Sequence, residues 1–296
     1  MKKTGHTPSR LPDRARLVMA VMSATGGSGR STVAGLLADR MAQVSSTVVV
    51  DLAPRLSSPW PRLAAGQDAT GLAGLPPDQP QTRSQVRGAC ATSSGGDGHP
   101  RWHFLTDLRD WHASPLRLPE EAAPWYQLAS AGGWQTIIAD TRHTVGHDIV
   151  QARYSVERAS TREWYELPYT IGVLTATATS SGIQTLQQAV RALQADGLPL
   201  NHTVIALVSV GDGRIPPAVQ AAATMLKAHV PAVVRIPYDP VIRAQGLSRR
   251  SRLRSRTREA IGDLADAVTD TAREAWGDPL PDAPQPAALA LSTTAL

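Results

Sequence analysis

The amino-acid sequence predicts an α/β protein with a doubly wound, mainly parallel sheet of about seven strands and helices on both faces. Short runs of β-branched residues alternate with longer segments of helical period. Several of these runs lack polar alternation, which is typical of strands buried on both faces. The chain of 296 residues is 42% hydrophobic and 19% charged, a composition that supplies one large core and excludes a disordered protein.

Seven runs are predicted as strands because they are short, apolar and rich in β-branched residues. They are residues 17–22, 47–52, 103–105, 136–140, 171–175, 203–208 and 232–236. Helices are predicted over 31–41, 82–91, 183–193, 219–226 and 251–276, where apolar residues recur at helical spacing. Thr82 is the expected N-cap of the second of these helices, and Gly197 is the expected C-cap region of the third.

The predicted domain spans residues 16–277 and contains a loop-rich insert, residues 54–100, with many Pro, Gly and Ser residues. A flexible basic arm, residues 1–15, precedes the domain, and a proline-rich tail, residues 278–296, is expected to be disordered. No apolar stretch reaches the roughly 18 to 20 residues that span a bilayer. Cys90 is the single cysteine, so neither an intrachain disulfide nor a cysteine zinc cluster can form, and we expect a cytoplasmic protein.

The strongest chemical signal is a glycine-rich loop, Ala24-Thr25-Gly26-Gly27-Ser28-Gly29-Arg30-Ser31-Thr32, between the first strand and the first helix. Such a loop turns successive backbone amides toward one centre, where the helix dipole also favours an anion. Phosphate is the expected ligand, with the Ser31 hydroxyl oxygen coordinating Mg²⁺ and Thr32 binding an inner phosphate. The alternative is a glycine-rich turn that binds nothing.

Two other kinds of site find no support in the sequence. His143 and His147 are four residues apart, but they lack the glutamate of a zinc-protease helix, and Gly146 is expected to break a helix there. No GxSxG elbow is present, so a serine hydrolase of that type is not predicted.

The loop TGGSGRST resembles the deviant P-loop of the ParA/MinD-like ATPases, whose usual form is KGGxGK[ST]. Three further segments resemble that family in order and spacing: VVVDLAP at the second strand, GGWQTIIADT at the Walker B strand, and VVRIPYDP after the last strand. The resemblance covers about residues 17–275 and implies a P-loop NTPase fold in which two subunits enclose two ATP molecules. It also implies a role in positioning DNA, cell-division proteins or envelope machines.

The resemblance implies a specific set of site residues. Those expected at the nucleotide are Gly26, Gly27, Ser28, Gly29, Arg30, Ser31 and Thr32 around the phosphates, with Pro237 and Asp239 in the adenine-side loop. Asp140 is expected to hold the Mg²⁺ shell together with Ser31. Asp51, at the end of the second strand, is the candidate catalytic residue; its alternative role is to fix the loop that follows it.

The sequence departs from the family pattern at positions that matter for hydrolysis. Arg30 replaces the P-loop lysine, and Thr25 replaces the lysine that reaches across the dimer. Ala53 replaces the second aspartate of the VDxDP segment, which positions the attacking water. Because phosphoryl transfer depends on positioned charge, slow or absent hydrolysis is expected. Arg55 and Arg142 are candidate replacement cations or ordinary surface arginines, and Ser209 stands where the family has the asparagine that recognises adenine.

Seven arginines lie between Arg243 and Arg258, a stretch that more than accounts for the formal charge of +5. Arg249, Arg250, Arg252 and Arg254 are candidate contacts to a polyanion, either duplex DNA or an acidic membrane surface. An acidic protein partner or a solvated arginine-rich face are the alternatives. Cations at the start of the last helix also oppose its dipole, so a group outside the helix is expected to offset them.

The sequence therefore predicts an ATP- and Mg²⁺-binding protein with weak or no ATPase activity. Its expected role is a spatial or assembly factor for an envelope machine, such as a secretion system or pilus, or for DNA partitioning. The resemblance also implies a homodimer, an envelope-machine or cell-division partner, and peripheral association with the inner membrane face. The alternative is a non-enzymatic interaction scaffold that has lost nucleotide binding.

Overall fold

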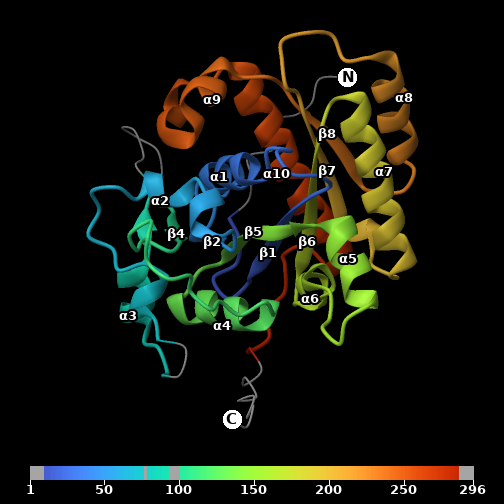
Figure 1. Cartoon of the computed structure of the whole chain (residues 1–296). Coiled ribbons are helices and arrows are strands. Elements are labelled where there is room, and N and C mark those ends of the chain that lie inside the picture. The colour runs from blue at the N-terminus through green and yellow to red at the C-terminus, as the bar shows by residue number, and fades with distance from the viewer. Residues whose placement is uncertain (1–9, 77–78, 94–100, 287–296) are drawn as a thin grey trace.

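The computed structural model describes residues 10–76, 79–93 and 101–286, apart from the side chains of residues 249 and 251. Within these ranges the chain forms one eight-stranded sheet with helices on both faces (Figure 1). The predicted doubly wound, mainly parallel α/β fold is thus confirmed.

The strands are β1 (Leu17–Ser23), β2 (Thr47–Asp51), β3 (Ala91–Thr92), β4 (His103–Leu105), β5 (Thr136–Thr144), β6 (Thr170–Thr177), β7 (Thr203–Val208) and β8 (Ala232–Ile236). Their order in the sheet is β3-β4-β2-β5-β1-β6-β7-β8, and every pair is parallel except β3 with β4. The strand beyond the seven predicted is β3, which has two residues and so offers no periodicity to detect.

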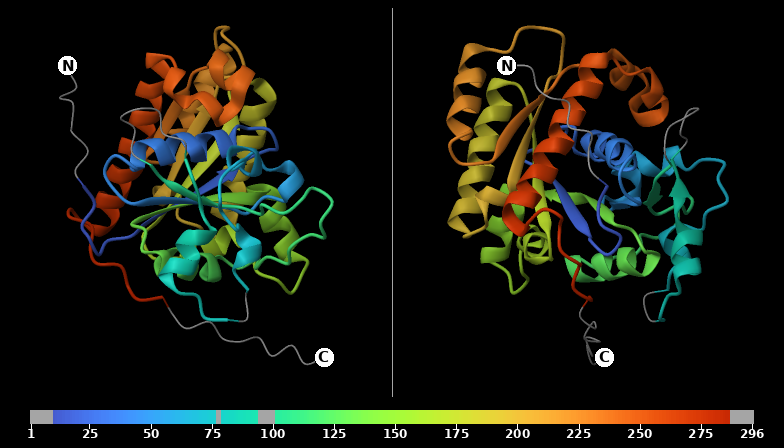
Figure 2. Two further views of the ribbon diagram at one scale, coloured as in Figure 1. Left: turned by 90° about the vertical axis from the view of Figure 1, so that its left-hand side faces the viewer. Right: turned by 180° about the vertical axis from the view of Figure 1, so that it is seen from behind.

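The helices are α1 (Arg30–Met41), α2 (Trp60–Leu63), α3 (Arg83–Ala89), α4 (Ala122–Gly132), α5 (Val145–Arg153), α6 (Ser160–Glu166), α7 (Ser180–Ala195), α8 (Pro217–Leu226), α9 (Pro240–Gln245) and α10 (Ser255–Trp276). One face of the sheet packs against α1, α2 and α10, and the opposite face against α3 to α8 (Figure 2). Alternate residues of each central strand enter the two cores: in β1, for example, Val18 faces one and Met19 the other. This double burial explains the apolar runs in the sequence.

Several element boundaries differ from the prediction. Thr82 is the N-cap of α3 in a capping box with Gln85, but the helix ends at Ala89. The last helix begins at Ser255 because residues Gly246–Arg252 form a 3₁₀ segment, η4. Gly146 lies inside α5, so the expected helix break at that glycine is wrong.

The described parts of the expected arm and the expected tail contact each other. Leu280 is buried, and the Ala283 backbone N–H donates a hydrogen bond to the Arg14 carbonyl at 2.9 Å. Residues 1–9 and 287–296 of the expected arm and tail lie outside the described ranges.

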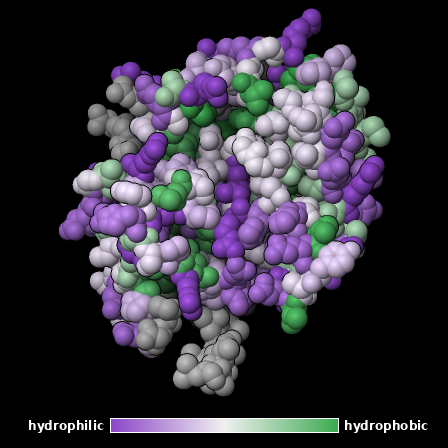
Figure 3. Space-filling model, in the orientation of Figure 1, coloured by the Kyte–Doolittle hydropathy of each residue, from purple (hydrophilic) through white to green (hydrophobic). Residues whose placement is uncertain are grey.

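The surface of the described residues mixes polar and apolar side chains, as Figure 3 shows for one face. Its exposed large hydrophobic residues include Leu56, Trp111, Tyr154 and Val156. Within the described ranges, no helix has both the length and the apolar character needed to cross a membrane.

The parallel arrangement brings the carboxyl ends of the central strands to one edge of the sheet. Asp51 and Asp140 are register partners on β2 and β5, and Val21, near the end of β1, is the partner of Asp140 on its other side. In open parallel sheets, ligands bind in the crevice outside this edge. The loops that follow β1, β2, β5 and β8 therefore define the candidate site.

Candidate functional site

The loop at residues 26–32, named here the phosphate loop, connects β1 to the first turn of α1. Gly27 and Gly29 adopt left-handed backbone conformations, with φ of 74° and 83°. Gly29 is the N-cap of α1 and has no side chain to accept hydrogen bonds from the first-turn amides. These amides are therefore available to an anion, in the way that phosphate-binding helix N-termini require.

Ser28 anchors the phosphate loop to the sheet. Its side chain is buried, and its Oγ lies 2.7 Å from Oγ1 of Thr175 on β6. Thr175 Oγ1 in turn lies 3.1 Å from the Met22 carbonyl at the end of β1. The contact fixes the centre of the loop while the glycines around it turn. Ser28 thus supports the loop with its side chain.

The glycines of the loop have different surroundings. A Cβ atom on Gly29 would lie 3.3 Å from Cγ1 of Val208, at the end of β7, whereas Gly26 and Gly27 face open space. Gly29 is therefore needed for close packing against β7 as well as for its backbone conformation. The open side of Gly26 and Gly27 leaves room for a ligand at the loop.

Arg30 contacts the carboxylate expected to hold magnesium. Its Nε donates a hydrogen bond to Asp140 Oδ1 at 2.7 Å, and its Nη1 donates to the Arg142 carbonyl at 3.2 Å. The Arg30 side chain is 17% exposed and the Asp140 side chain is fully buried. Because a buried carboxylate requires a compensating charge, Arg30 supplies that charge in this structure.

Trp60, at the start of α2, donates a hydrogen bond to the second oxygen of the same carboxylate. Its indole Nε1 donates to Asp140 Oδ2 at 2.8 Å, and the whole residue is buried. The ring packs against Trp102 and Phe104, with ring centroids 5.9 and 5.6 Å away. Trp60 comes from the loop-rich insert and is not among the predicted site residues; no spacing in the sequence links it to Asp140.

Asp51 is buried beside Asp140 and fixes the segments that follow β2 and β4. Its Oδ1 accepts a hydrogen bond from the Ala53 N–H, and its Oδ2 accepts from the hydroxyls of Ser58 and Thr106 at 2.6 Å each. Burial, and next the charge of Asp140, raise the pKa of Asp51 to about 7, against the opposing effect of these hydrogen bonds. The contacts are those expected of the loop-fixing alternative.

Thr25 and Ala53, two of the positions that depart from the family pattern, have uncharged side chains. Ala53 is buried, and its N–H is bound to Asp51. Thr25 is half-buried at the start of the glycine-rich loop. Of the candidate replacement cations, Arg55 pairs with Asp107 and donates to the carbonyls of Trp111 and Ala113. Arg142 pairs instead with Glu120.

Asp239, expected beside adenine, joins the starts of two helices. It is buried, and its Oδ1 accepts from the Val241 N–H at α9. Its Oδ2 accepts from the Arg254 N–H and the Thr257 hydroxyl at the start of α10. Burial alone raises the pKa of Asp239, but these hydrogen bonds lower it below its usual value. Pro237 is half-buried in the same β8–α9 connection.

The arginine-rich segment is divided between internal contacts and solvent. Arg250 forms an ion pair with Asp39 at 2.7 Å and stacks over Trp102, so it belongs to the folded core of this region. Arg254 pairs with Asp212, as does Arg256, while Arg252 is exposed. Asp212 and Asp239 are the groups that offset the arginines at the start of α10. The Arg249 side chain lies outside what the structure describes.

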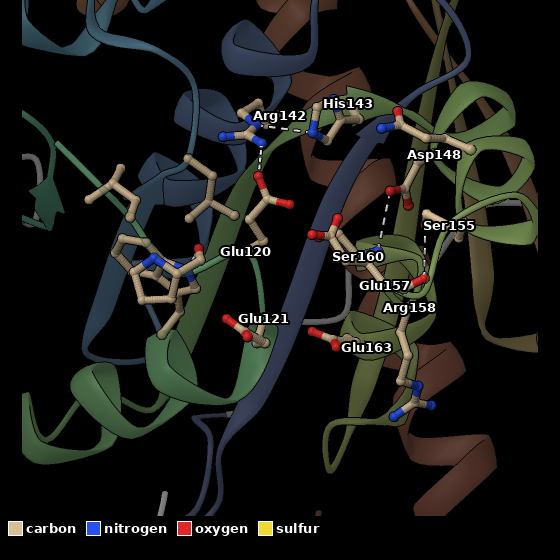
Figure 4. A pocket seen from close by; sticks show the side chains of 16 residues that line it. Glu120, Glu121, Arg142, His143, Asp148, Ser155, Glu157, Arg158, Ser160 and Glu163 are labelled. Carbon is tan, nitrogen blue, oxygen red and sulfur yellow. Dashed lines mark hydrogen bonds and ion pairs between the residues drawn. The ribbon is translucent and has the colours of Figure 1, made fainter. Parts of the chain in front are cut away.

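A cavity of about 490 Å³ lies next to the end of β5, between α4, α5 and α6 (Figure 4). Two of its five carboxylates accept backbone hydrogen bonds: Asp148 from the amides of Ser160 and Thr161 at the start of α6, and Glu163 from the Ala122 amide at the start of α4. His143 lies in its wall, with its ring 6.5 Å from that of His147. Over the described residues, no group of three or more His, Cys, Asp or Glu side chains is arranged to hold a metal ion.

A second, more open groove of about 1000 Å³ lies between the segment after β2, residues 108–111, and the α9–η4 region. Leu56 and Trp111 line it and are 76% and 74% exposed. Arg55 holds the Trp111 loop through the backbone contacts described above. This groove places two apolar side chains on an arginine-rich part of the surface.

Comparison with known proteins shows the fold. No family model matches the chain, and no curated protein matches it. Among solved structures, a ParA family ATPase from Chlorobium tepidum is 17% identical with a TM-score of 0.60, covering 85% of this chain and 98% of that chain. The septum site-determining protein MinD of Pyrococcus horikoshii, complexed with Mg-ADP, is 19% identical with a TM-score of 0.56, covering 87% and 97%. A putative plasmid partition protein of Borrelia burgdorferi, bound to AMPPNP, is 10% identical with a TM-score of 0.52, covering 88% and 99%. The chain has the ParA/MinD-type P-loop fold, as its motifs predicted.

Proposed function

We propose that the chain binds ATP at the phosphate loop and acts as a spatial or assembly factor. The observation that supports nucleotide binding most strongly is the loop itself. It has two left-handed glycines, an N-cap without a side-chain acceptor, and open space beside Gly26 and Gly27, all at the carboxyl edge of a parallel sheet. In this geometry backbone amides and the α1 dipole act together on a phosphate group, with Thr32 as an additional hydroxyl donor.

The proposed activity is ATP binding with slow or no hydrolysis. Ala53 has no group to orient water, and both oxygens of Asp51 accept hydrogen bonds from its own neighbourhood. Thr25 provides no charge to a partner subunit's phosphate. Because phosphoryl transfer is catalysed mainly by positioning and charge stabilisation, the loss of these elements lowers turnover far more than affinity.

The proposed biological role follows from the fold and from the surface. The similar structures include ParA and MinD ATPases and a plasmid partition protein. By analogy with them, the chain forms a homodimer and positions a cell-division protein, an envelope machine or DNA in the cytoplasm or at the inner membrane face. Arg252, the last residue of η4, and Arg254 are exposed and are the proposed contacts to a polyanion.

The second candidate function is an interaction scaffold without nucleotide. It is favoured by the groove that contains Leu56 and Trp111, because exposed aromatic and aliphatic side chains among arginines are typical of protein-binding surfaces. The two functions differ in one respect that can be measured directly, which is affinity for ATP.

Titration calorimetry with ATP and ADP tests the proposal. We expect both nucleotides to bind the wild-type chain and Thr32→Val to weaken binding, because the variant removes one hydroxyl from the phosphate loop at nearly constant shape. Thr224→Val makes the same change on the exposed face of α8 and should bind nucleotide as the wild type does. Absence of binding to either nucleotide would leave the scaffold as the function. Unaltered binding by Thr32→Val would place the nucleotide elsewhere.

A further inference from the structure

We propose that Arg30 takes the place of the divalent cation at this site, so that nucleotide phosphates bind the loop without Mg²⁺. The inference rests on the proposed function, because it concerns how the same loop neutralises a phosphate group. It replaces the expectation that Asp140 and Ser31 hold a magnesium shell.

The Asp140 carboxylate is already satisfied by the protein. Oδ1 accepts from Arg30 Nε at 2.7 Å and Oδ2 accepts from Trp60 Nε1 at 2.8 Å. Both Asp140 and Trp60 are completely buried, and Trp60 is packed among Trp102 and Phe104. A metal ion coordinated to either oxygen would have to share that oxygen with a donor that the surrounding structure holds in position.

The donor at Oδ1 is a permanent cation. A lysine can lose its proton in a crowded electropositive site, but an arginine keeps its charge in proteins. Mg²⁺ next to Asp140 would therefore face the Arg30 guanidinium across the same carboxylate. Repulsion between the two cations disfavours the metal unless the ion pair opens, and opening it costs Arg30 its hydrogen bond to the Arg142 carbonyl as well.

The same guanidinium can serve a phosphate group. Arg30 is the first residue of α1, directly after Gly29, and therefore lies among the amides that would bind the anion. A guanidinium has five N–H donors in a planar arrangement, whereas the contacts to Asp140 and Arg142 engage only Nε and Nη1. Arg30 can thus remain paired with Asp140 and bind a phosphate oxygen with its remaining donors, as arginine often does.

The test measures ATP and ADP affinity by calorimetry in EDTA and in excess MgCl₂, for the wild type and three variants. For the wild type we expect the two affinities to agree within about threefold. Arg30→Gln keeps much of the side-chain length but removes the cation, so it should weaken binding in EDTA and gain a dependence on Mg²⁺. Arg142→Gln is the matched control: its carbonyl remains, its side chain binds Glu120, and its affinities should equal those of the wild type. Ser31→Ala, which removes the expected metal-ligand hydroxyl, should leave the ratio of the two affinities unchanged.

Each result decides the question. Wild-type affinity that falls more than about threefold in EDTA overturns the inference while leaving nucleotide binding intact. The inference is also overturned if the wild type binds equally well in EDTA and in MgCl₂ and Arg30→Gln has the same affinities as the wild type. Another group then neutralises the phosphate. Absence of binding under both conditions overturns the proposed function and this inference with it. Circular dichroism of each variant confirms that a loss of affinity does not arise from unfolding.

Discussion

Asp51, the last residue of β2, lies directly opposite Asp140 of β5 in the sheet register, so two buried carboxylates are neighbours on the side of the sheet where the phosphate loop lies. The two carboxylates have different hydrogen-bond partners. Asp140 is paired with the cationic Arg30, whereas the donors to Asp51 among the described residues are neutral, namely the Ala53 amide and two hydroxyls. Burial, and next the charge of Asp140, raise the pKa of Asp51, and a pH-dependent stability follows.

Asp51→Asn should remove a pH dependence of the free energy of unfolding. The pKa of Asp51 is about 7 in the folded chain, against a usual value of 3.8, so the folded state keeps the proton up to a higher pH than the unfolded state does. Its stabilising contribution is therefore complete below about pH 4 and is lost as the pH rises to about 7. The shift corresponds to at most about 4 kcal/mol. Asn does not titrate, its side chain carbonyl can accept from the Ala53 amide, and its NH₂ can donate to hydroxyls.

Urea unfolding between pH 4 and pH 8 measures this effect. We expect the wild type to lose stability over that range relative to Asp51→Asn, with Asp68→Asn at an exposed position as the control. Parallel pH profiles for all three proteins would mean that Asp51 is ionised throughout and is neutralised by a group other than those named here.

Trp60→Phe should destabilise the fold by leaving Asp140 Oδ2 without its indole donor. An unsatisfied buried acceptor costs about 1 to 3 kcal/mol. Trp164→Phe is the matched control, because Trp164 is equally buried and its Nε1 has no hydrogen-bond partner among the described residues. The difference between the two free energies of unfolding, from urea titration, isolates the contact to Asp140. Equal losses in the two variants would show that Trp60 contributes only its packing.

Gly29→Ala should be more destabilising than Gly27→Ala. Both glycines have positive φ, and a left-handed alanine costs roughly 1 to 2 kcal/mol. Only at Gly29 does the new Cβ also meet Val208, at 3.3 Å, and Gly27 faces open space. Thermal unfolding of the two variants, and of Gly29→Ala combined with Val208→Ala, checks the explanation. If the double variant recovers no stability relative to Gly29→Ala, the contact with Val208 is not the cause.

Arg250→Gln should destabilise the fold, whereas Arg252→Gln should not. Arg250 loses its ion pair with Asp39 and its stacking over Trp102, and we expect a loss of about 1 to 3 kcal/mol. Arg252 is exposed, so its replacement should change stability by about 0.5 kcal/mol or less. Guanidinium unfolding of both variants provides the comparison, and equal stability would contradict an internal role for Arg250.

The exposed arginines should bind a polyanion in a salt-dependent way. The wild type is expected to bind duplex DNA or acidic vesicles, and Arg252→Gln should weaken that binding while the fold persists. For duplex DNA, each lost phosphate contact reduces the slope of log affinity against log salt by about 0.9. Fluorescence anisotropy and vesicle sedimentation over a salt series distinguish the two ligands. If neither binds at low salt, Arg252 and Arg254 belong to a solvated face or to a protein-binding surface.

The sequence is most informative where function depends on local pattern. The phosphate loop, the central strands and the edge positions of Asp51 and Asp140 follow from a glycine-rich turn and from apolar runs, both of which are properties of adjacent residues. Four motifs in a fixed order resemble one family, and the fold that this resemblance implies is the fold that the chain adopts.

The contacts that define the chemistry of the site are not predictable in this way. Trp60 reaches Asp140 across 80 residues, and Thr106 reaches Asp51 across 55. Trp60 begins the four-residue α2 and Thr106 follows the three-residue β4, and both elements are too short to show a periodicity. Arg250 likewise belongs to a charged run, and only its distant partners Asp39 and Trp102 distinguish it from Arg252. Long-range pairing of polar side chains depends on tertiary structure, which a single sequence does not display.

The most direct test of the central claim, that the phosphate loop binds nucleotide through its amides, is hydrogen–deuterium exchange with and without ATP. We expect ATP to slow the exchange of the peptide that covers residues 24–33, because phosphate oxygens accept hydrogen bonds from first-turn amides that lack a side-chain cap. The same protection should appear in EDTA, since Arg30 supplies the cation. Unchanged exchange of this peptide at saturating ATP would contradict the account.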